Sequence, residues 1–126
     1  MIRPEFVDHL VFRVSDLDKT ERFYNTVLGQ EPERFEASLM YTVGDTRLFF
    51  TDSVESRSGN DDKEKIGLNH VAFGVRTLAE LERFQQQLDN CGISHSGVKL
   101  DPYGLKEFIW LDDPDGLRIE FYLRPE

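Results

Sequence analysis

The chain has 126 residues, of which 39% are apolar and 12% aromatic, enough for one domain with a packed core. Twenty-four acidic residues against 15 basic ones give a net charge of −9, which repels polyanions and excludes a nucleic-acid-binding role. The single cysteine excludes an internal disulfide, and no apolar run is long enough for a signal core or a membrane span, so we expect a cytoplasmic protein without a membrane partner.

The first half of the chain predicts a strand, a helix and a hairpin. Residues 6–14 form an apolar run with a period of two, which indicates a strand. Asp16 then precedes apolar residues at helical spacing, and the pattern stops at Gly29, as is typical of a capped helix. Two short apolar runs, about 39–43 and 47–51, are joined by a Gly-Asp pair that favours a tight turn.

The second half begins the same pattern again after a polar stretch. Residues 52–66 lack any apolar period and predict a linker between two modules, about 1–52 and 67–126, of a single domain. Residues 68–75 indicate a strand, and Thr77 with Glu80 forms a capping box for a helix that runs to about Asn90. Two further strands, 107–111 and 117–123, flank an Asp-Pro-Asp-Gly turn.

The two halves are related as an internal repeat. Residues 8–23 align without a gap with residues 69–84, and seven positions are identical: His9/His70, Phe12/Phe73, Val14/Val75, Leu17/Leu78, Glu21/Glu82, Arg22/Arg83 and Phe23/Phe84. Each half covers one face of its sheet with a helix and leaves the other face bare. We therefore expect an α+β fold in which the two half-sheets form a curved mixed-sheet cup with the helices outside.

Three polar side chains are in phase on the sheet faces turned away from the helices. Period-two alternation places His9, His70 and Glu120 there. Two imidazoles and one carboxylate suit a divalent metal and leave coordination positions for water or substrate, which favours a catalytic over a structural site. Phe49 takes the place of Glu120 in the first half, so we expect three protein ligands rather than four.

Other inward positions predict a binding pocket. The candidate substrate-binding residues are Arg13, Met40, Arg47, Phe49, Phe108 and Trp110. The two arginines suit an anionic group of the substrate, unless they are rim residues paired with nearby acids. The apolar residues suit a pocket wall, unless they are plain core. Tyr103, beside a glycine, is a candidate catalytic donor to a metal-bound oxygen, or else a surface tyrosine in a turn.

The chain resembles the vicinal oxygen chelate superfamily, which includes glyoxalases, bleomycin resistance proteins and extradiol dioxygenases, over essentially its whole length. The residues that carry the resemblance are Asp8-His9, the run 69–73 (NHVAF) and the run 111–121 (LDDPDGLRIEF). The resemblance implies paired βαβββ modules, a metal held by His9, His70 and Glu120, and a substrate that binds the metal through oxygen.

The match to individual subfamilies is partial. Glyoxalase I has four protein ligands, and Phe49 argues against that reaction. Extradiol dioxygenases place a histidine and a tyrosine where Tyr103 and Trp110 fall nearest, and His95 replaces that histidine only if it reaches the site by another route. The three ligands and small size are similar to the fosfomycin-modifying group, without its cation-binding loop. The reaction therefore stays open among lyase, isomerase, transferase and dioxygenase chemistry.

Two classes of function fit these residues. The first is a metal-dependent enzyme that binds one Fe, Mn, Zn or Ni ion as a Lewis acid, with Glu120 and Tyr103 in catalysis. The alternative is a metal-free or degenerate binding protein that sequesters an aromatic or antibiotic-like ligand. Exposed sheet edges also predict a homodimer, with the metal site built either within one chain or across two.

Overall fold

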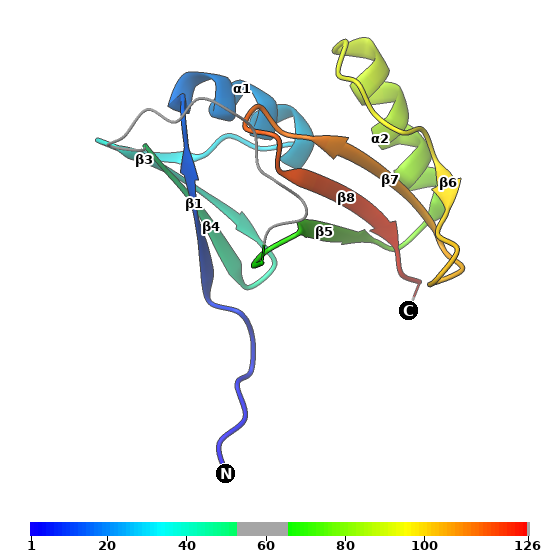
Figure 1. Cartoon of the computed structure of the whole chain (residues 1–126), viewed down its shortest axis with the longest axis horizontal. Helices are drawn as coiled ribbons and strands as arrows, with labels where there is room; N and C mark the ends of the chain where they lie inside the picture. The colour runs from blue at the N-terminus through cyan, green and yellow to red at the C-terminus, as the bar shows by residue number, and fades with distance from the viewer. Residues whose placement is uncertain (53–65, 126) are drawn as a thin grey trace. The chain divides into compact units, whose positions relative to one another are not determined.

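The computed structural model describes residues 1–52 and 66–125, which belong to two compact units, Met1–Ser58 and Gly59–Glu126 (Figure 1). Each unit is a strand, a helix and three strands, so the expected α+β class and the paired βαβββ modules are confirmed. The polar linker expected over residues 52–66 lies almost entirely outside the described residues.

The first unit is a four-stranded mixed sheet with one helix. Its elements in chain order are β1 (His9–Val14), α1 (Leu17–Leu28), β2 (Glu33–Phe35), β3 (Ser38–Val43) and β4 (Thr46–Asp52). The sheet order is β1-β4-β3-β2, with β1 parallel to β4 and the other pairs antiparallel. The β3–β4 hairpin closes through Gly44 and Asp45, as predicted, because Gly44 adopts the positive φ of 58° that the tight turn requires.

Local sequence fixes the ends of α1 and its packing. The Asp16 side chain accepts a hydrogen bond from the backbone N–H of Lys19 at 3.1 Å, and Gly29 ends the helix in the left-handed conformation. The buried ring of Tyr24 packs against Phe50 of β4, with the ring centres 4.2 Å apart. The helix therefore covers the sheet face that carries the apolar alternate residues.

The second unit repeats this arrangement. Its elements are β5 (His70–Val75), α2 (Leu78–Asn90), β6 (Lys99–Leu100), β7 (Glu107–Asp112) and β8 (Arg118–Leu123). The sheet order is β5-β8-β7-β6, with β5 parallel to β8. Thr77 and Glu80 form the predicted capping box at the start of α2. Phe84 stacks on Phe121 with 3.7 Å between ring centres, which fixes α2 on the sheet.

The internal repeat is visible in the strand registers. His9 lies opposite Arg47 in the β1–β4 pair, and His70 lies opposite Arg118 in the β5–β8 pair. Two positions further along, Val11 lies opposite Phe49, and Ala72 lies opposite Glu120. The register therefore confirms that Phe49 and Glu120 are equivalent positions of the two modules.

Two short strands, β2 and β6, were not predicted from the sequence. Both are short, exposed strands at the edge of a sheet, and both contain charged residues. An edge strand pairs through its backbone on one side only, so it needs no alternating apolar pattern that the sequence could reveal. The first strand is also shorter than the expected range of 6–14. Phe6 and Val7 precede it and are 55% and 56% exposed, since pairing with β4 starts at His9.

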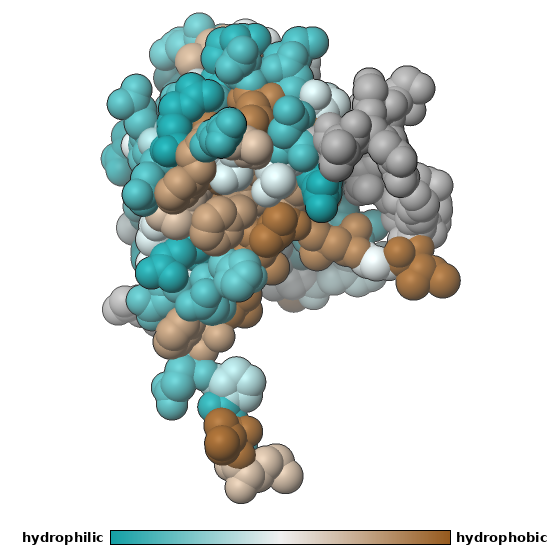
Figure 2. Space-filling view, turned by 90° about the vertical axis from the view of Figure 1, so that its left-hand side faces the viewer, coloured by the Kyte–Doolittle hydropathy of each residue, from teal (hydrophilic) through white to brown (hydrophobic). Residues whose placement is uncertain are grey.

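The surface carries several apolar side chains. The N-terminal residues extend away from the first unit as an arm, and Met1 and Ile2 are fully or almost fully exposed (Figures 1 and 2). On the first sheet, Val11 is 57% exposed and Phe35 is 49% exposed. Neither of the described helices has the length and apolar character that crossing a membrane requires.

Candidate metal and substrate site

Each of the two repeated histidines is held by the residue before it. The Nδ1 atom of His9 lies 2.8 Å from Asp8 Oδ2, and the Nδ1 atom of His70 lies 2.8 Å from Asn69 Oδ1. Both partners are hydrogen-bond acceptors, so Nδ1 carries the proton in each ring. In the neutral ring, the Nε2 atom then keeps its lone pair, which is the state that metal ligation needs.

His70 and Glu120 come together on the open face of the second sheet. The Nε2 atom of His70 lies 3.6 Å from Glu120 Oε1. Glu120 is buried, with 8% of its surface exposed, whereas the His70 side chain is 39% exposed. The separation of the two atoms is longer than the range of about 2.7–3.2 Å for N–H···O hydrogen bonds.

This separation fits a metal ion. Two ligand atoms bonded at about 2.1 Å to one tetrahedral ion lie about 3.4 Å apart. With the ring neutral, the Nε2 lone pair and the carboxylate repel each other unless a cation lies between them, and the burial of Glu120 increases that cost. The pair therefore has the donor types, the tautomer and the spacing of two adjacent ligands.

The third predicted ligand belongs to the other unit. His9 lies on the open face of the first sheet, with its side chain 51% exposed and its ring 5.7 Å from the ring of Phe49. Within residues 1–52 and 66–125, no three His, Cys, Asp or Glu side chains gather around one point. The convergence of His9 with His70 and Glu120 thus stays a prediction, while the second unit brings His70 and Glu120 together.

A groove surrounds the His70–Glu120 pair. Its volume is about 890 Å³, and its lining residues all lie in the second unit. Phe108 and Trp110 form part of its wall, as expected from the strand phase, because β7 places them on the same face as Glu120. Ala72 and Gly74 of β5 form a low floor, and a side-chain carbon built on Gly74 meets no atom within 4 Å.

Tyr122 is a site residue to which sequence reasoning gave no role. It follows Glu120 by two residues on β8 and lines the same groove. Its hydroxyl donates to Asp101 Oδ2 at 2.6 Å, and this hydrogen bond raises the pKa of Tyr122 and lowers the pKa of Asp101. Gly104 leaves room for the bond, since a side-chain carbon there would collide with the Tyr122 hydroxyl. The two-residue spacing from Glu120 is the signal in the sequence that places it on the same face.

Tyr103 lies at the rim of the groove rather than beside the donor pair. It is 95% exposed, and its backbone N–H donates to Asp101 Oδ1 at 3.0 Å in a tight turn. Its predicted catalytic role stays a prediction. The tyrosine that shares the open face of β8 with Glu120 is Tyr122.

The remaining predicted substrate-binding residues lie in the first unit. Arg13, Met40, Arg47 and Phe49 share the open face of the first sheet with His9, as the registers of β1, β3 and β4 show. Arg13 and Arg47 are exposed, and Met40 and Phe49 are partly buried. None of these four residues lines the groove of the second unit.

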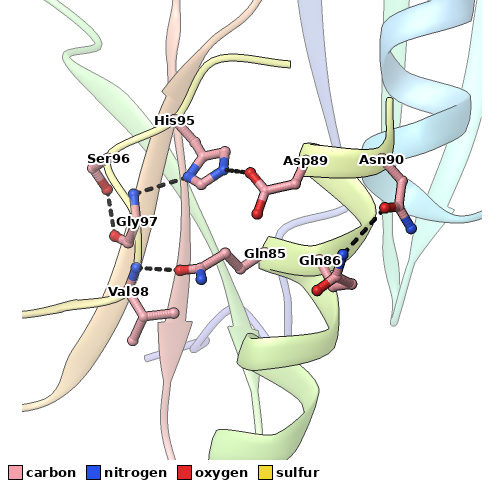
Figure 3. A network of polar contacts seen from close by, with 8 residues as sticks. All are labelled: Gln85, Gln86, Asp89, Asn90, His95, Ser96, Gly97 and Val98. Carbon is pink, nitrogen blue, oxygen red and sulfur yellow. Dashed lines mark hydrogen bonds and ion pairs between the residues drawn. The ribbon is translucent and has the colours of Figure 1, made fainter. Parts of the chain in front are cut away.

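The remaining histidine is committed elsewhere, so its suggested route into the site is wrong. His95 Nε2 lies 2.6 Å from Asp89 Oδ1 on α2, and His95 Nδ1 accepts from the Gly97 N–H at 2.9 Å (Figure 3). Beside it, Gln85 accepts from the Val98 N–H at 2.7 Å (Figure 3). The bonds of His95 Nε2 and Gln85 therefore tie the segment after α2 to the helix, whereas His95 Nδ1 is bonded within that segment. The groove lining does not include His95.

Comparison with known proteins agrees with this architecture. The chain matches the Glyoxalase/Bleomycin resistance protein/Dioxygenase superfamily over residues 6–121. It is 32% identical to the uncharacterized protein YwkD of Bacillus subtilis (strain 168), covering 92% of this chain and 94% of that one. It is 28% identical to the metallothiol transferase FosB of Shouchella clausii (strain KSM-K16), covering 92% and 78%. The crystal structure of SMU.1112c superposes with a TM-score of 0.80 at 28% identity, covering 95% of this chain and 99% of that chain.

Proposed function

The chain belongs to the Glyoxalase/Bleomycin resistance protein/Dioxygenase superfamily, and we propose on that premise that it is a metal-dependent enzyme acting on a small molecule. One divalent ion is held by His9, His70 and Glu120, and the substrate binds the ion through oxygen. The ion is Fe, Mn, Zn or Ni, since imidazole and carboxylate ligands accept each of them.

One observation carries this proposal: Nε2 of His70 lies 3.6 Å from the buried carboxylate of Glu120, while Asn69 holds the other ring nitrogen. A neutral hydrogen-bonded pair would be shorter, and a plain structural pair would not need Asn69 to set the tautomer. The matching Asp8–His9 contact in the first unit supports His9 as the third ligand, because it leaves the same nitrogen free.

A bound ion would act as a Lewis acid that stabilises negative charge on a substrate oxygen. The residues of this chain bind and orient the substrate around that position. Phe108 and Trp110 exclude water along one wall of the groove. Tyr122 has its proton committed to Asp101, so its hydroxyl oxygen accepts a hydrogen bond from a donor group on the substrate.

Among the reactions open to this superfamily, we favour group transfer or a lyase reaction over ring-cleaving dioxygenation. The relative FosB is named a metallothiol transferase, which supports transfer chemistry. The dioxygenase reading needs a further histidine near the substrate. His95 does not supply it, because both of its ring nitrogens are bonded at α2 and the segment that follows.

Metal analysis after purification without chelators tests the proposal. We expect about one divalent ion per chain, or uptake of one added Co²⁺ or Mn²⁺ ion per chain. His95→Gln is the matched control, because it removes a histidine outside the groove and should leave the metal content unchanged. If the wild-type protein takes up no ion under these conditions, the metal-dependent reading is wrong.

The second candidate is the metal-free binding protein, and the aromatic wall of Phe108 and Trp110 favours it. Such a protein would bind an aromatic ligand equally well with and without added metal. The metal-dependent enzyme instead predicts that a chelating ligand binds more tightly to the metal-loaded protein. Fluorescence of Trp110, the single tryptophan of the chain, reports binding in both cases.

We also propose a homodimer that covers exposed apolar residues such as Val11 and Phe35. Solution scattering at micromolar concentration should give the mass of two chains, and a clean monomer would refute the dimer. Mixing His9→Ala chains with Glu120→Gln chains then locates the site. Metal binding returns in the mixture if His9 joins the partner chain, and stays lost if His9 joins its own chain.

A further inference from the structure

The groove of the second unit is basic although the chain is acidic. Four cationic side chains line it, against two carboxylates, in a protein with a net charge of −9. The cationic residues are Arg76, Lys99, Arg118 and Arg124. A local charge opposite to that of the whole chain concentrates anions in the groove and points to an anionic ligand.

The two carboxylates in the groove have their own roles. Asp101 accepts hydrogen bonds from the Tyr122 hydroxyl and the Tyr103 N–H, which hold its charge within the turn that follows β6. Glu120 faces His70. Within the described residues, neither carboxylate forms an ion pair with one of the four cations, so the cationic groups are not neutralised inside the groove.

Arg118 is placed by an aromatic ring rather than by an acid. Its guanidinium lies over Trp110, 4.1 Å from the ring centre. Stacking of this kind positions the charge while leaving the terminal nitrogens for hydrogen bonds to a carboxylate or phosphate. At the other end of the groove, Arg76 donates to the backbone carbonyl of Arg124 at 3.0 Å, which brings these two arginines together.

The cations and the metal-ligand pair are separated along the strands. Glu120 and Arg124 are four residues apart in an extended chain, which corresponds to about 13 Å. Lys99 lies opposite Phe108, in the row of the sheet that also contains Tyr122 and Gly74. Between the two ends the floor is low, because Gly74 leaves open space.

We propose that this groove binds an elongated anion. The oxygen-bearing head lies at His70 and Glu120, and a carboxylate, phosphate or sulfonate tail lies at Lys99, Arg76 and Arg124. The inference rests on the proposed function for the head, whereas the tail site stands on the charge and shape of the groove. In this proposal Lys99, Arg76 and Arg124 bind the anionic group, in place of Arg13 and Arg47 of the first unit.

The probe is suberic acid monohydroxamate, which carries a bidentate oxygen head and a carboxylate tail. Its matched control is the primary amide of the same molecule, which has an uncharged tail of similar size. Quenching of Trp110 fluorescence measures both affinities, with and without added Co²⁺. The metal-free preference for the acid tests the tail site alone, and the gain on adding Co²⁺ tests the proposed metal site.

We expect the acid to bind metal-free protein about tenfold more tightly than the amide, through several partly exposed ion pairs. The double variant Lys99→Gln/Arg124→Gln should lose this preference. Arg22→Gln/Arg83→Gln, which removes the same two positive charges from exposed positions of α1 and α2, should keep it. Equal affinities for acid and amide in the wild-type protein, or no binding of either, would overturn the inference. So would a preference that disappears in Arg13→Gln/Arg47→Gln and survives in Lys99→Gln/Arg124→Gln.

Gly74→Val tests the shape of the groove separately from its charge. Gly74 has no positive φ and open space above it, so valine fits the strand while filling the floor of the groove. We expect the variant to fold and to keep its Co²⁺ uptake, and to bind the acid at least about tenfold more weakly. Unchanged affinity for the acid would show that the tail does not lie along this floor, and would overturn the inference.

Discussion

The two units share one module but divide the chemistry unequally. At equivalent positions of the open sheet faces, the first unit has Val11 and Phe49 where the second has Ala72 and Glu120. Two residues further along the strand, the first unit has Arg13 where the second has Gly74. The repeat therefore keeps the fold and the histidine in both units, while the second unit alone combines a buried carboxylate with a low groove floor.

Comparing the two units shows that the fold requires apolar residues on the sheet face that packs against the helix. The helix-facing residues are aromatic or aliphatic in both units, and the pairs Phe12–Phe50 and Phe73–Phe121 lie in the same places of the two sheets. These positions stabilise the packing of helix on sheet. Within residues 1–52 and 66–125, neither helix packs on the open faces, so these faces are free to differ. We propose that their differences carry the function.

The largest effect is expected from the carboxylate that the first unit lacks. Glu120→Gln keeps the size of the buried side chain but removes the charge that a metal ion needs. We expect its affinity for Co²⁺ or Mn²⁺ to fall by at least about 100-fold, more than for loss of a supporting residue. Glu82→Gln on α2 is the control and should bind as the wild type does. Equal affinities of Glu120→Gln and wild type would remove Glu120 from the ligand set.

Restoring the symmetry of the two units is the converse experiment. Phe49→Glu puts a carboxylate at the position equivalent to Glu120, beside His9. We expect the metal-free variant to be about 1–3 kcal/mol less stable, because a partly buried carboxylate lacks a partner. Divalent metal at 100 times its Kd should then raise the free energy of unfolding of the variant by about 2.7 kcal/mol. Thermal unfolding with and without metal measures both changes.

Phe49→Leu serves as the control for this change. It also removes the aromatic ring but adds no ligand, so metal should stabilise it only as much as it stabilises the wild type. If metal stabilises Phe49→Glu no more than Phe49→Leu, position 49 does not face the metal, and the pseudosymmetric site is wrong.

A smaller effect is expected from the residues that orient the two imidazoles. Asn69→Ala and Asp8→Ala each free the Nδ1 atom of a histidine. We expect metal affinity to fall by about tenfold in each, as is usual for loss of a supporting hydrogen bond. Asn90→Ala, at the end of α2, is the control for Asn69→Ala. Titration calorimetry with Mn²⁺ distinguishes this change from the larger loss in Glu120→Gln.

The smallest effect concerns the helix caps, which also differ between the units. Helix α1 has one cap bond from Asp16, whereas α2 has the reciprocal box of Thr77 and Glu80. Thr77→Ala should lower the free energy of unfolding by about 1 kcal/mol near neutral pH, measured by urea denaturation.

The cap prediction carries its own dependence on pH. The Thr77 hydroxyl, as the main cause, lowers the pKa of Glu80 below its usual 4.5, so the folded state binds this proton less readily than the unfolded chain does. The box therefore stabilises the protein above pH 4.5, and the stabilisation is lost as the pH falls through the lowered pKa of Glu80. We expect the cost of Thr77→Ala to shrink at about pH 3. A cost that is the same at both pH values would show that Glu80 is not part of the cap.

Most of the fold was predictable because its signals are local. Strand alternation, the cap at Asp16, the Thr77–Glu80 box and the Gly44-Asp45 turn all act within a few residues, and the structure confirms each. The edge strands β2 and β6 were missed because their pairing depends on a neighbour distant in sequence rather than on their own pattern.

The site was less predictable than the fold. Strand phase placed His70, Glu120, Phe108 and Trp110 on one face, and this placement is confirmed. The groove also depends on residues from the turn after β6 and from the ends of β5 and β8. Asp101 is held in the groove by the hydrogen bond that it accepts from the Tyr122 hydroxyl, and the Arg124 carbonyl accepts one from Arg76. The spacing of residues in the sequence predicts neither contact. The same holds for His95, whose bonds to α2 exclude it from the site.

A crystal structure of the Co²⁺-loaded protein, with the ion located by its anomalous scattering, tests the central claim most directly. We expect one anomalous peak per chain within about 2.0–2.2 Å of three protein atoms: Nε2 of His9, Nε2 of His70 and a carboxylate oxygen of Glu120. A peak held by other residues, a peak without His9, or no peak at these side chains would contradict the account.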